Sequence, residues 1–482
     1  MPHNFYQRSR NGIRKVGRRM LRLGLSFALA ISLVPCLMYA PGAFAASVDV
    51  ERAETLIWGT EGHSSPATGR LVLEQAAEQG DLAAMRALGM HLVYGWVLSK
   101  EVSKGLDLLE QAASGGDADA QNDLGQIYLW GLAGLKDAKQ SRKYLEASSA
   151  QGHLEAMRTL GKQLVMGTLF EQDVNAGIGH LKAALAQDDA KSYVTLGVLY
   201  LEGSGVPLDR DTARKNFEKA ADLGDGEGLL RFGENTMWQE IDSTIAEDAL
   251  LRAAEIGETK AYVVLANGAM YGYLGGGSVS RKKYQTYADK AVEAGEEYIA
   301  VLEAERLLWG IGVRASGPRA IESLTSAADQ GNSEAARFLI ALLRDGNNLN
   351  VRQSSADAQK ALLKYSGLLS QKQREQYDLT LKAARAKTPS AYAPVADAFM
   401  ERTDLSSTWF GKEIYKANSN VAFYILQVRL KYEGLYKGTV HGLATRQTLK
   451  AVFEACLKSV APKICKDNVM RADVIGALLA KK

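Results

Sequence analysis

Residues 112–125, AASGGDADAQNDLG, contain the signature that decides the fold of this chain. Written as Ala-Ala-x-x-Gly-Asp-x-x-Ala-x-x-x-Leu-Gly, the signature also occupies residues 76–89, and residues 148–161 repeat it with serines for the alanines and His153 for the aspartate. The signature glycine, or the Asp188 that replaces it once, recurs at intervals of 36, 36, 36, 36, 33, 38 and 36 residues, at Gly80, Gly116, Gly152, Asp188, Gly224, Gly257, Gly295 and Gly331. A fixed period of this size predicts a solenoid of repeats, whose first use is as a binding surface.

The fifth copy shows how one unit is built. Apolar residues from Ala190 to Tyr200 fall on one helical face, and Gly203-Ser204-Gly205-Val206-Pro207 then ends that helix. A second helix follows with its paired alanines at Ala220 and Ala221, which let neighbouring helices approach closely, and Gly224 ends it. The sequence therefore predicts an all-α fold of about eight helix-turn-helix repeats.

The signature, the 36-residue period and the run Leu196-Gly197-x-x-Tyr200-x-x-Gly203-x-Gly205-Val206 resemble Sel-one-like repeats, which are relatives of tetratricopeptide repeats. The resemblance covers about residues 70–345 and implies a right-handed α/α superhelical solenoid. It also implies an adaptor within protein complexes, because members of this family usually have that role, and many bacterial members act at the cell envelope. The family has no fixed catalytic residues, so the resemblance implies none here.

The first 45 residues have the three parts of a secretory signal peptide. Seven basic residues and no acidic one precede an apolar run from Leu23 to Tyr39, and Ala43-Phe44-Ala45 then offers small residues for cleavage before Ala46. We therefore expect a periplasmic protein, either free or associated with the outer membrane. An uncleaved membrane anchor is the alternative.

The charge of the mature chain is uneven. Without the signal peptide it carries 51 basic and 55 acidic residues, and residues 411–482 alone carry 13 basic and 5 acidic ones. The C-terminal segment thus has a net charge of +8, and residues 46–410 have a net charge of −12. A basic segment suits an anionic partner such as peptidoglycan or an acidic polysaccharide, although it can also be only a solvated face. The expected location outside the cytoplasm argues against nucleic acid as a partner.

Five segments are expected from these patterns. The apolar spacing of a helix continues after the last repeat, and Thr388-Pro389-Ser390-Ala391-Tyr392-Ala393-Pro394 then reads as a break. The segments are a signal peptide at 1–45, the solenoid at 46–345, a helical cap at 346–387, a linker at 388–415 and a small C-terminal domain at 416–482.

The C-terminal domain is similar to a peptidoglycan-binding-like domain, a small three-helix fold, over about residues 418–456. The residues that carry the likeness are Leu426-Gln427-x-x-Leu430-x-x-x-Gly434-Leu435-Tyr436-x-Gly438, followed by Gly442 and Thr448-x-x-Ala451-Val452. The sequence departs from the family at His441, where an aspartate is usual, and at Thr445 and Ala455-Cys456. The resemblance implies either sugar binding or a protein-interaction module.

Two cysteines remain after removal of the signal peptide, which carries Cys36. Cys456 and Cys465 lie nine residues apart. Exported proteins seldom keep two nearby free thiols, so we predict a disulfide between them. Two separately buried thiols are the alternative.

The sequence shows no pattern of catalysis or cofactor binding. None of the mature histidines stands in a metal-binding spacing, and no phosphate-binding loop of the form G-x-x-x-x-G-K-[ST] is present. Acidic pairs such as Glu296-Glu297 stand at helix starts, where capping explains them. We therefore predict a protein that is not an enzyme, with no cofactor and no metal.

One position of the repeat does carry unusual residues. Fourteen residues after each signature glycine the chain places, in order, Tyr94, Trp130, Met166, Glu202, Trp238, Tyr271, Trp309 and Asp345. Two interpretations are open for the aromatic ones: they pack against the next repeat, or they form a ladder that stacks on sugars or anchors a partner's apolar side chains. The partner-binding candidates are Tyr94, Trp130, Trp238, Tyr271 and Trp309.

These observations favour a non-catalytic extracytoplasmic scaffold or regulatory adaptor that binds envelope proteins. The resemblance implies a process as well, because exported members of the family include regulators and assembly factors for secreted polysaccharide. We therefore expect a role in exopolysaccharide or cell-envelope biogenesis. The alternative is a structural tether that binds carbohydrate or peptidoglycan.

Overall fold

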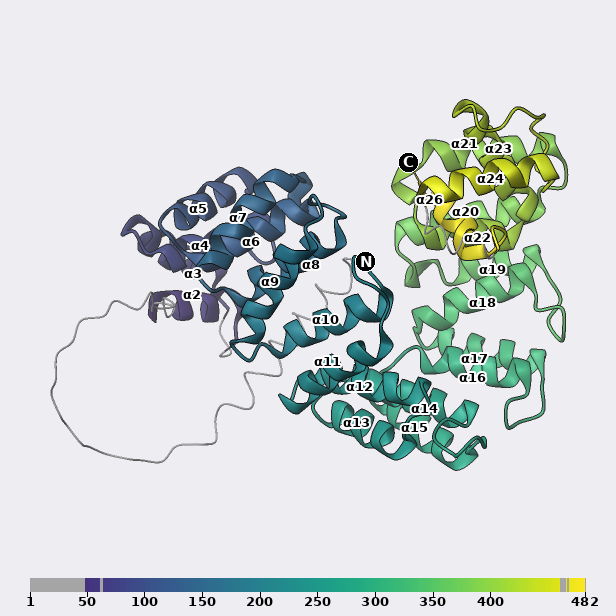
Figure 1. The fold of residues 1–482 in the computed structure, drawn as a ribbon, viewed down its shortest axis with the longest axis horizontal. Coiled ribbons are helices and arrows are strands. Elements are labelled where there is room, and N and C mark those ends of the chain that lie inside the picture. The colour runs from purple at the N-terminus through teal and green to yellow at the C-terminus, as the bar shows by residue number, and fades with distance from the viewer. Residues whose placement is uncertain (1–47, 61–63, 460–464, 466–467, 482) are drawn as a thin grey trace. The chain divides into compact units, whose positions relative to one another are not determined.

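The computed structural model of this protein describes residues 48–60, 64–459, 465 and 468–481, and all regular secondary structure within them is helical (Figure 1). The chain divides into two compact units, Met1–Phe232 and Gly233–Lys482. The expected signal peptide, residues 1–45, lies outside the described residues. Among the helices of the described part, none is long and apolar enough to cross a membrane.

Eight helix pairs follow a first helix, α2 (Val48–Trp58), and they coincide with the eight copies of the signature. In each pair the first helix ends just before the signature glycine or its substitute, and the second helix begins just after it. The all-α repeat fold predicted from the sequence is thereby confirmed. The pairs are α3 (Pro66–Glu78) with α4 (Leu82–Tyr94), α5 (Val102–Ser114) with α6 (Ala118–Trp130), α7 (Ala138–Ala150) with α8 (Leu154–Met166), α9 (Val174–Leu185) with α10 (Ala190–Glu202), α11 (Arg210–Asp222) with α12 (Gly226–Trp238), α13 (Ser243–Glu255) with α14 (Lys260–Tyr271), α15 (Arg281–Glu293) with α16 (Ile299–Trp309), and α17 (Gly317–Asp329) with α18 (Ser333–Asp345).

The signature aspartate caps the second helix of its pair. Asp81 accepts a hydrogen bond from the backbone N–H of Ala84 at 3.0 Å, which satisfies a donor that the first turn of a helix leaves unpaired. His153 has the same role in the third copy. Its Nδ1 accepts from the N–H of Ala156 at 3.2 Å, and its Nε2 lies 2.9 Å from Asp119 Oδ1. The substitution at this position therefore preserves the cap.

The glycine that closes the signature lets helices of neighbouring repeats pack backbone to backbone. A Cβ on Gly89 of α4 would lie 2.8 Å from the carbonyl oxygen of Gly105 in α5, and a Cβ on Gly105 would lie 2.7 Å from that of Gly89. Gly161 and Gly177 make the same approach between α8 and α9. Close backbone approach requires residues without a Cβ, which explains the Leu-Gly end of the signature.

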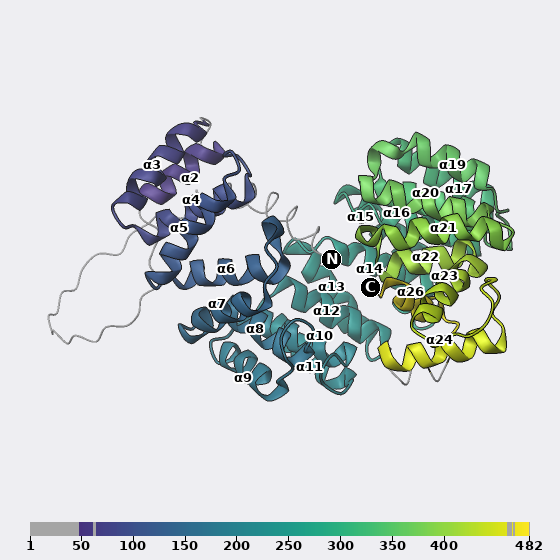
Figure 2. The same cartoon turned by 90° about the horizontal axis from the view of Figure 1, so that it is seen from above.

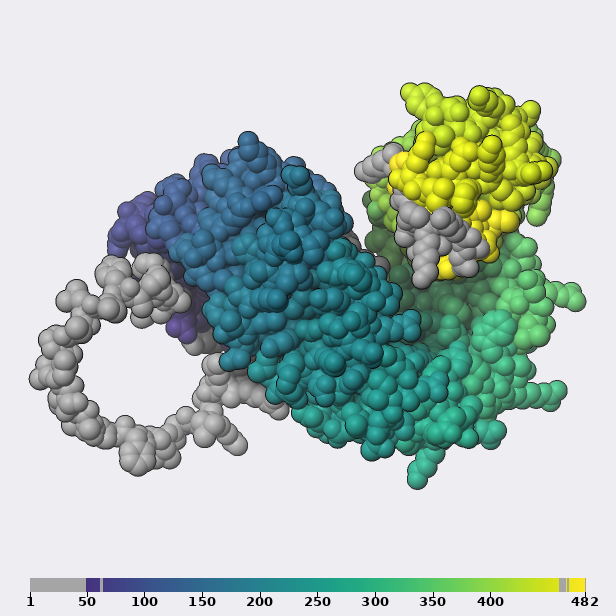
Figure 3. Space-filling view, viewed as in Figure 1, coloured from purple at the N-terminus to yellow at the C-terminus, as the bar shows by residue number. Residues whose placement is uncertain are grey.

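Consecutive repeats contact each other within each unit. The second helix of one repeat packs on the first helix of the next, as α4 does on α5, α6 on α7, and α16 on α17 (Figure 2). A short 3-10 helix, η1 (Leu132–Gly134), joins α6 to α7. In Figure 3, segments that follow one another in the sequence lie side by side on the surface of each unit, as the gradual change of colour shows.

The helices after the last repeat begin with α19 (Ser355–Lys364), η2 (Ser366–Leu368) and α20 (Gln371–Arg385), within the segment expected to be a cap. The linker expected at 388–415 is wrong, because α21 (Pro389–Glu401), η3 (Thr403–Leu405) and most of α22 (Thr408–Ala417) fill this segment. Pro389 stands in the first turn of α21, where proline is tolerated because the missing N–H would have no partner. Pro389 therefore marks the start of a helix rather than a break, and Pro394 lies inside that helix.

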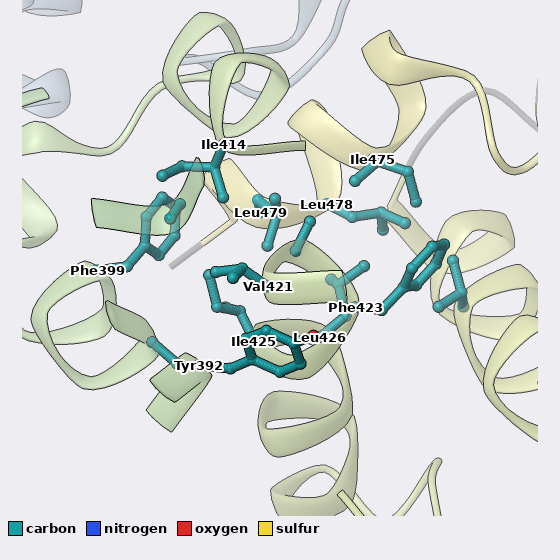
Figure 4. Packing of buried hydrophobic residues seen from close by; sticks show 14 of the residues in the cluster. Tyr392, Phe399, Ile414, Val421, Phe423, Ile425, Leu426, Ile475, Leu478 and Leu479 are labelled. Atoms are coloured by element: carbon teal, nitrogen blue, oxygen red, sulfur yellow. The ribbon is translucent and has the colours of Figure 1, made fainter. Parts of the chain in front are cut away.

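The domain boundary expected at residue 416 is also wrong, because it falls inside α22. That helix packs so closely on α26 (Ala472–Ala480) that a Cβ on Gly411 would lie 2.6 Å from the carbonyl oxygen of Gly476. Side chains from α20 to α26, including α23 (Ser419–Tyr432) and α24 (Arg446–Ser459), share one hydrophobic core (Figure 4). The members that Figure 4 labels are Tyr392, Phe399, Ile414, Val421, Phe423, Ile425, Leu426, Ile475, Leu478 and Leu479.

A buried ion network joins the last repeat to these C-terminal helices. Arg344 in α18 is fully buried, and its Nη2 donates to Glu413 Oε2 in α22 at 2.7 Å. Arg344 also donates from Nε and Nη2 to the two carboxylate oxygens of Asp345, each at 2.6 Å. Lys416 donates to the other oxygen of Glu413 at 2.9 Å. The C-terminal helices are thus bound to the solenoid by charge as well as by apolar packing.

Candidate protein-binding surface

The eight ladder residues occupy one structural position. Each is the last residue of the second helix of its repeat, from Tyr94 at the end of α4 to Asp345 at the end of α18. In most repeats the next residue is a glycine in the left-handed conformation that ends the helix, such as Gly131 with φ 66° and Gly310 with φ 72°. The repeat therefore fixes the backbone position of these eight residues, whatever their side chains.

Four of the five aromatic candidates are exposed. The exposed fractions are 52% for Trp130, 40% for Trp238, 48% for Tyr271 and 55% for Trp309, whereas Tyr94 is half-buried. A ring whose purpose is to fill a gap between repeats would be covered by them. About half of each ring is instead available to another molecule, which is the geometry that a binding anchor needs. Binding by these residues stays a prediction.

Tyr94 belongs to a cluster that the sequence did not reveal. Its ring stacks on that of Trp96 with centroids 4.7 Å apart, and Trp96 in turn lies 6.0 Å from Trp58. Glu54 accepts hydrogen bonds from Trp58 Nε1 at 2.6 Å and lies 3.0 Å from Nε2 of the buried His91. Because its members bond and stack on one another, this cluster closes the first repeat, and Tyr94 has a packing role.

Trp130 is held by its own helix. Its Nε1 donates to Gln126 Oε1 at 2.9 Å, one turn earlier in α6, and Gln126 donates from Nε2 to Thr159 Oγ1 at 2.9 Å. The bonds fix the ring and leave its exposed part oriented. An oriented aromatic ring loses little conformational entropy when a partner binds it.

A second aromatic group lies in the other unit, around the half-buried Glu305 of α16. Burial raises the pKa of the Glu305 carboxyl. Burial is also the main cause that raises the pKa of Tyr271 and of Tyr298, and the nearby charge of Glu305 adds to it in both. Tyr298 is 48% exposed, like Tyr271. The two phenols and the carboxylate are therefore neighbours on the surface.

The ladder pattern found only part of this group. Tyr298, Glu305 and Tyr273 were missed, although Tyr273 meets Trp238 edge to face with centroids 4.8 Å apart. Counting from the signature glycine Gly295, Tyr298 and Glu305 stand three and ten residues on, while the ladder residue Trp309 stands fourteen on. Spacings of seven and four residues bring side chains to one face of a helix, so the signal that could have found them was the helical period.

Cys456 and Cys465 are joined in the disulfide that the sequence predicts, and both are buried in the C-terminal core. The bond closes a loop of nine residues' separation. A loop of this length contributes about 2–3 kcal/mol by restricting the unfolded chain.

Mass spectrometry of protein isolated without reductant should therefore show the peptides of Cys456 and Cys465 cross-linked, and reduction should lower the free energy of unfolding by about 2–3 kcal/mol. A Cys456→Ser, Cys465→Ser double variant provides the matched control, because reductant should not change its stability. Full alkylation of both thiols in unreduced protein would contradict the prediction.

The residues that carry the likeness to a peptidoglycan-binding-like domain serve the interior of the C-terminal region. Gln427 is fully buried, and its Oε1 accepts from the N–H groups of His441 and Gly442 at 2.9 and 2.8 Å. Its Nε2 donates to Thr448 Oγ1 at 2.8 Å. These bonds fix the chain between α23 and α24, so this part of the motif is explained by folding.

Metal binding has no cluster of ligands to support it in the part of the chain that the structure describes: no three or more His, Cys, Asp or Glu side chains gather as metal ligands would.

Comparison with known proteins identifies the repeat. The Sel1 repeat family matches residues 82–117, 118–153, 190–225 and 304–332. The match ends before the C-terminal helices, so the peptidoglycan-binding-like likeness at about 418–456 stays a prediction from the sequence. A comparison with curated proteins finds no match.

Among the solved structures that are similar to this chain, two have repeats of this kind. One is a protective antigen of uropathogenic Escherichia coli strains that displays an SLR fold; it is 19% identical, covers 85% of this chain and 93% of its own, and has a TM-score of 0.43. The other is a Sel1 repeat protein from Oxalobacter formigenes, 23% identical, which covers 51% of this chain and 99% of its own with a TM-score of 0.42. At these scores neither likeness carries an argument about function. The family matches show that the chain contains Sel1 repeats, a kind of repeat that mediates protein–protein interactions.

Proposed function

We propose that this protein is a non-catalytic adaptor that binds envelope proteins outside the cytoplasm, in exopolysaccharide or cell-envelope biogenesis. The observation that carries the proposal is the set of half-exposed aromatic rings at the same helix end of several repeats. Tryptophan and tyrosine supply much of the binding energy at protein interfaces. The net charge of −12 over residues 46–410 adds a preference for basic partners.

The extracytoplasmic address rests on the sequence of residues 1–45 and on the disulfide, since disulfides persist in oxidising compartments. We expect the mature chain to begin at Ala46. N-terminal sequencing of the protein from a periplasmic fraction would check this. An intact N-terminus in the membrane fraction, or a lipid-modified start at Cys36, would contradict it.

Truncating an exposed ladder tryptophan should weaken partner binding and leave the fold intact. We expect Trp130→Ala and Trp309→Ala each to cost about 2 kcal/mol of binding, roughly a thirtyfold loss of affinity. The melting temperature should change little, because a buried tryptophan would be needed for a loss of about 3–5 kcal/mol in stability. Crosslinking in cells, followed by quantitative recovery of envelope proteins, measures the first effect and thermal unfolding the second.

Tyr432→Ala is the matched control for this experiment. Tyr432 is 96% exposed and, like the ladder residues, is the last residue of its helix, but it lies outside the repeats. Partner recovery should be unchanged in this variant. If the tryptophan variants keep their partners while they remain folded, or if both of them unfold, the rings pack the repeats and the proposed function fails.

The alternative function, a tether to peptidoglycan or acidic polysaccharide, is favoured by the net charge of +8 on residues 411–482. The wild type and the two tryptophan variants distinguish this alternative from the adaptor function. A tether would sediment with purified peptidoglycan in a salt-sensitive manner, and the Trp130→Ala and Trp309→Ala variants would sediment as the wild type does.

A further inference from the structure

Glu305 differs from Glu303, the other carboxylate of its helix, because it has no partner among the described residues. Glu303 accepts from Arg306 Nε at 2.8 Å and from the hydroxyl of Tyr284 at 2.7 Å. No hydrogen bond or ion pair joins Glu305 to another described residue, although it is half-buried. Partial burial of a carboxylate without a counter-ion costs desolvation free energy, and the attraction of an approaching cation offsets this cost.

Aromatic rings surround this carboxylate. Glu305 and Trp309 lie four residues apart on α16, and Tyr298, the residue that precedes this helix, stands seven residues before Glu305, which is a spacing typical of one helix face. Tyr271 comes from the end of α14, which contacts α16, and it is close enough to sense the charge of Glu305. The faces of aromatic rings attract cations. The three rings are about half exposed, so a cation from solution can reach them.

A second unpaired acceptor lies in the previous repeat. Asn267 of α14 occupies the register position of Glu305, and its Oδ1 is buried without a hydrogen-bond partner among the described residues. Tyr271 follows it by one turn, as Trp309 follows Glu305. This oxygen is closed off from solvent, so of the two acceptors only the half-buried Glu305 is open to a donor from solution.

At the equivalent position in the second repeat, the acceptor has a hydrogen-bond donor within the chain. Gln126 stands ten residues after its signature glycine, as Glu305 does, and its Oε1 already accepts from Trp130 Nε1 at 2.9 Å. That acceptor has its partner within the chain. Glu305 has no such partner among the described residues, so a donor for its carboxylate has to come from another molecule.

From this juxtaposition we propose that the surface formed by Tyr271, Tyr298, Glu305 and Trp309 binds a lysine or arginine side chain of a protein partner. The cationic head lies against the Glu305 carboxylate and donates hydrogen bonds to its oxygens, and its stem packs on the rings. Charge complementarity selects this occupant, since the carboxylate, the ring faces and the net charge of −12 over residues 46–410 all favour a cation. The inference rests on the proposed adaptor function and specifies what the adaptor recognises.

The test uses full-length mature protein labelled with 5-fluorotryptophan and three probes: the peptide acetyl-Gly-Arg-Gly-amide, its neutral citrulline analogue, and choline. We expect the fluorine resonance of Trp309, assigned with a Trp309→Phe variant, to shift in a saturable manner with the arginine peptide. The citrulline peptide should bind at least roughly tenfold more weakly, because it lacks the charge. Choline should also bind more weakly, because it has no N–H to donate. The resonance of Trp130 should not respond and provides an internal control.

Glu305→Gln keeps the size of the side chain and removes its charge, and it should weaken the arginine peptide by roughly tenfold or more. The variant should be as stable as the wild type or more so, because an unpaired carboxylate is removed, and thermal unfolding confirms that it folds. Equal binding of the arginine and citrulline peptides, an unchanged affinity in Glu305→Gln, or tighter binding of choline would overturn the inference.

Failure of this inference and failure of the proposed function give different results. If Trp309→Ala loses envelope partners while Glu305→Gln keeps them, the adaptor function stands and the recognition of a basic side chain is wrong. If both tryptophan variants keep their partners, the adaptor function itself is wrong, whatever the peptides do.

Discussion

Replacing Arg344 with methionine is expected to lower the free energy of unfolding by about 3–5 kcal/mol, the largest effect of any charged residue in the described part of this chain. Arg344 is fully buried, and its guanidinium is the partner of Glu413, whose side chain is only 6% exposed. Methionine fills much of the space but leaves Glu413 in the core with Lys416 as its remaining cation. Chemical denaturation followed by circular dichroism would measure the loss.

The double variant Arg344→Met, Glu413→Leu separates the charge from the packing. Because a buried ion pair can be replaced by apolar side chains at little cost, the double variant should be more stable than Arg344→Met alone. A loss below about 1 kcal/mol in Arg344→Met, or additive losses in the double variant, would contradict a coupled buried pair.

The same network predicts a dependence on pH. Burial alone would raise the pKa of Glu413, but the charges of Arg344 and Lys416 outweigh it and leave this pKa below its usual value. A carboxyl whose pKa is lowered by folding stabilises the protein above its unfolded pKa, about 4.3, and loses that contribution as the pH falls through the folded value. The stability difference between the wild type and Glu413→Gln should therefore shrink as the pH is lowered below about 4.3.

Gly205→Ala is expected to destabilise the first unit by roughly 3 kcal/mol, much more than Gly224→Ala. Both glycines have φ 78°, and the left-handed conformation costs an alanine about 1–2 kcal/mol in each. A Cβ on Gly205 would also lie 1.9 Å from the carbonyl oxygen of Val165, whereas a Cβ on Gly224 would meet nothing within 4 Å. Relieving the overlap at Gly205 requires the backbone to move, which adds about 1–3 kcal/mol.

The two glycine variants form a matched pair because they share a backbone angle and differ only in their surroundings. Urea unfolding of each, compared with the wild type, isolates the effect of the close contact with α8. Equal losses in the two variants would show that the backbone angle alone sets the requirement for glycine, and that the approach of residue 205 to Val165 relaxes without a free-energy penalty.

The candidate surface could be predicted only in part, and the reason lies in what a repeat makes visible. Trp130 and Trp309 stand at a position counted from the signature glycine, so their place at a helix end followed from the period. Their exposure did not, because it depends on neighbours that the period does not specify. Glu305 was missed since a single glutamate on a helix is unremarkable until the structure shows that nothing pairs with it.

The prediction of a linker at 388–415 was wrong for a related reason. Thr388-Pro389 and Pro394 were read as a break, yet Pro389 stands in the first turn of α21, where proline is favourable, and Pro394 is accommodated inside the same helix. The distinction came from Tyr392 and Phe399, which are buried against side chains from α20 to α26. Burial of that kind depends on residues distant in the sequence.

The sequence by itself determined the eight helix pairs, the turns between them and the caps at Asp81 and His153, because these depend on interactions within about one turn of helix. Tertiary structure alone decided which side chains are buried and which polar groups have hydrogen-bond or ion-pair partners. Arg344 pairs with Glu413, 69 residues away in the sequence, while Glu305 pairs with no other described residue. Pairing over such distances follows from how whole helices pack, and no local pattern encodes it.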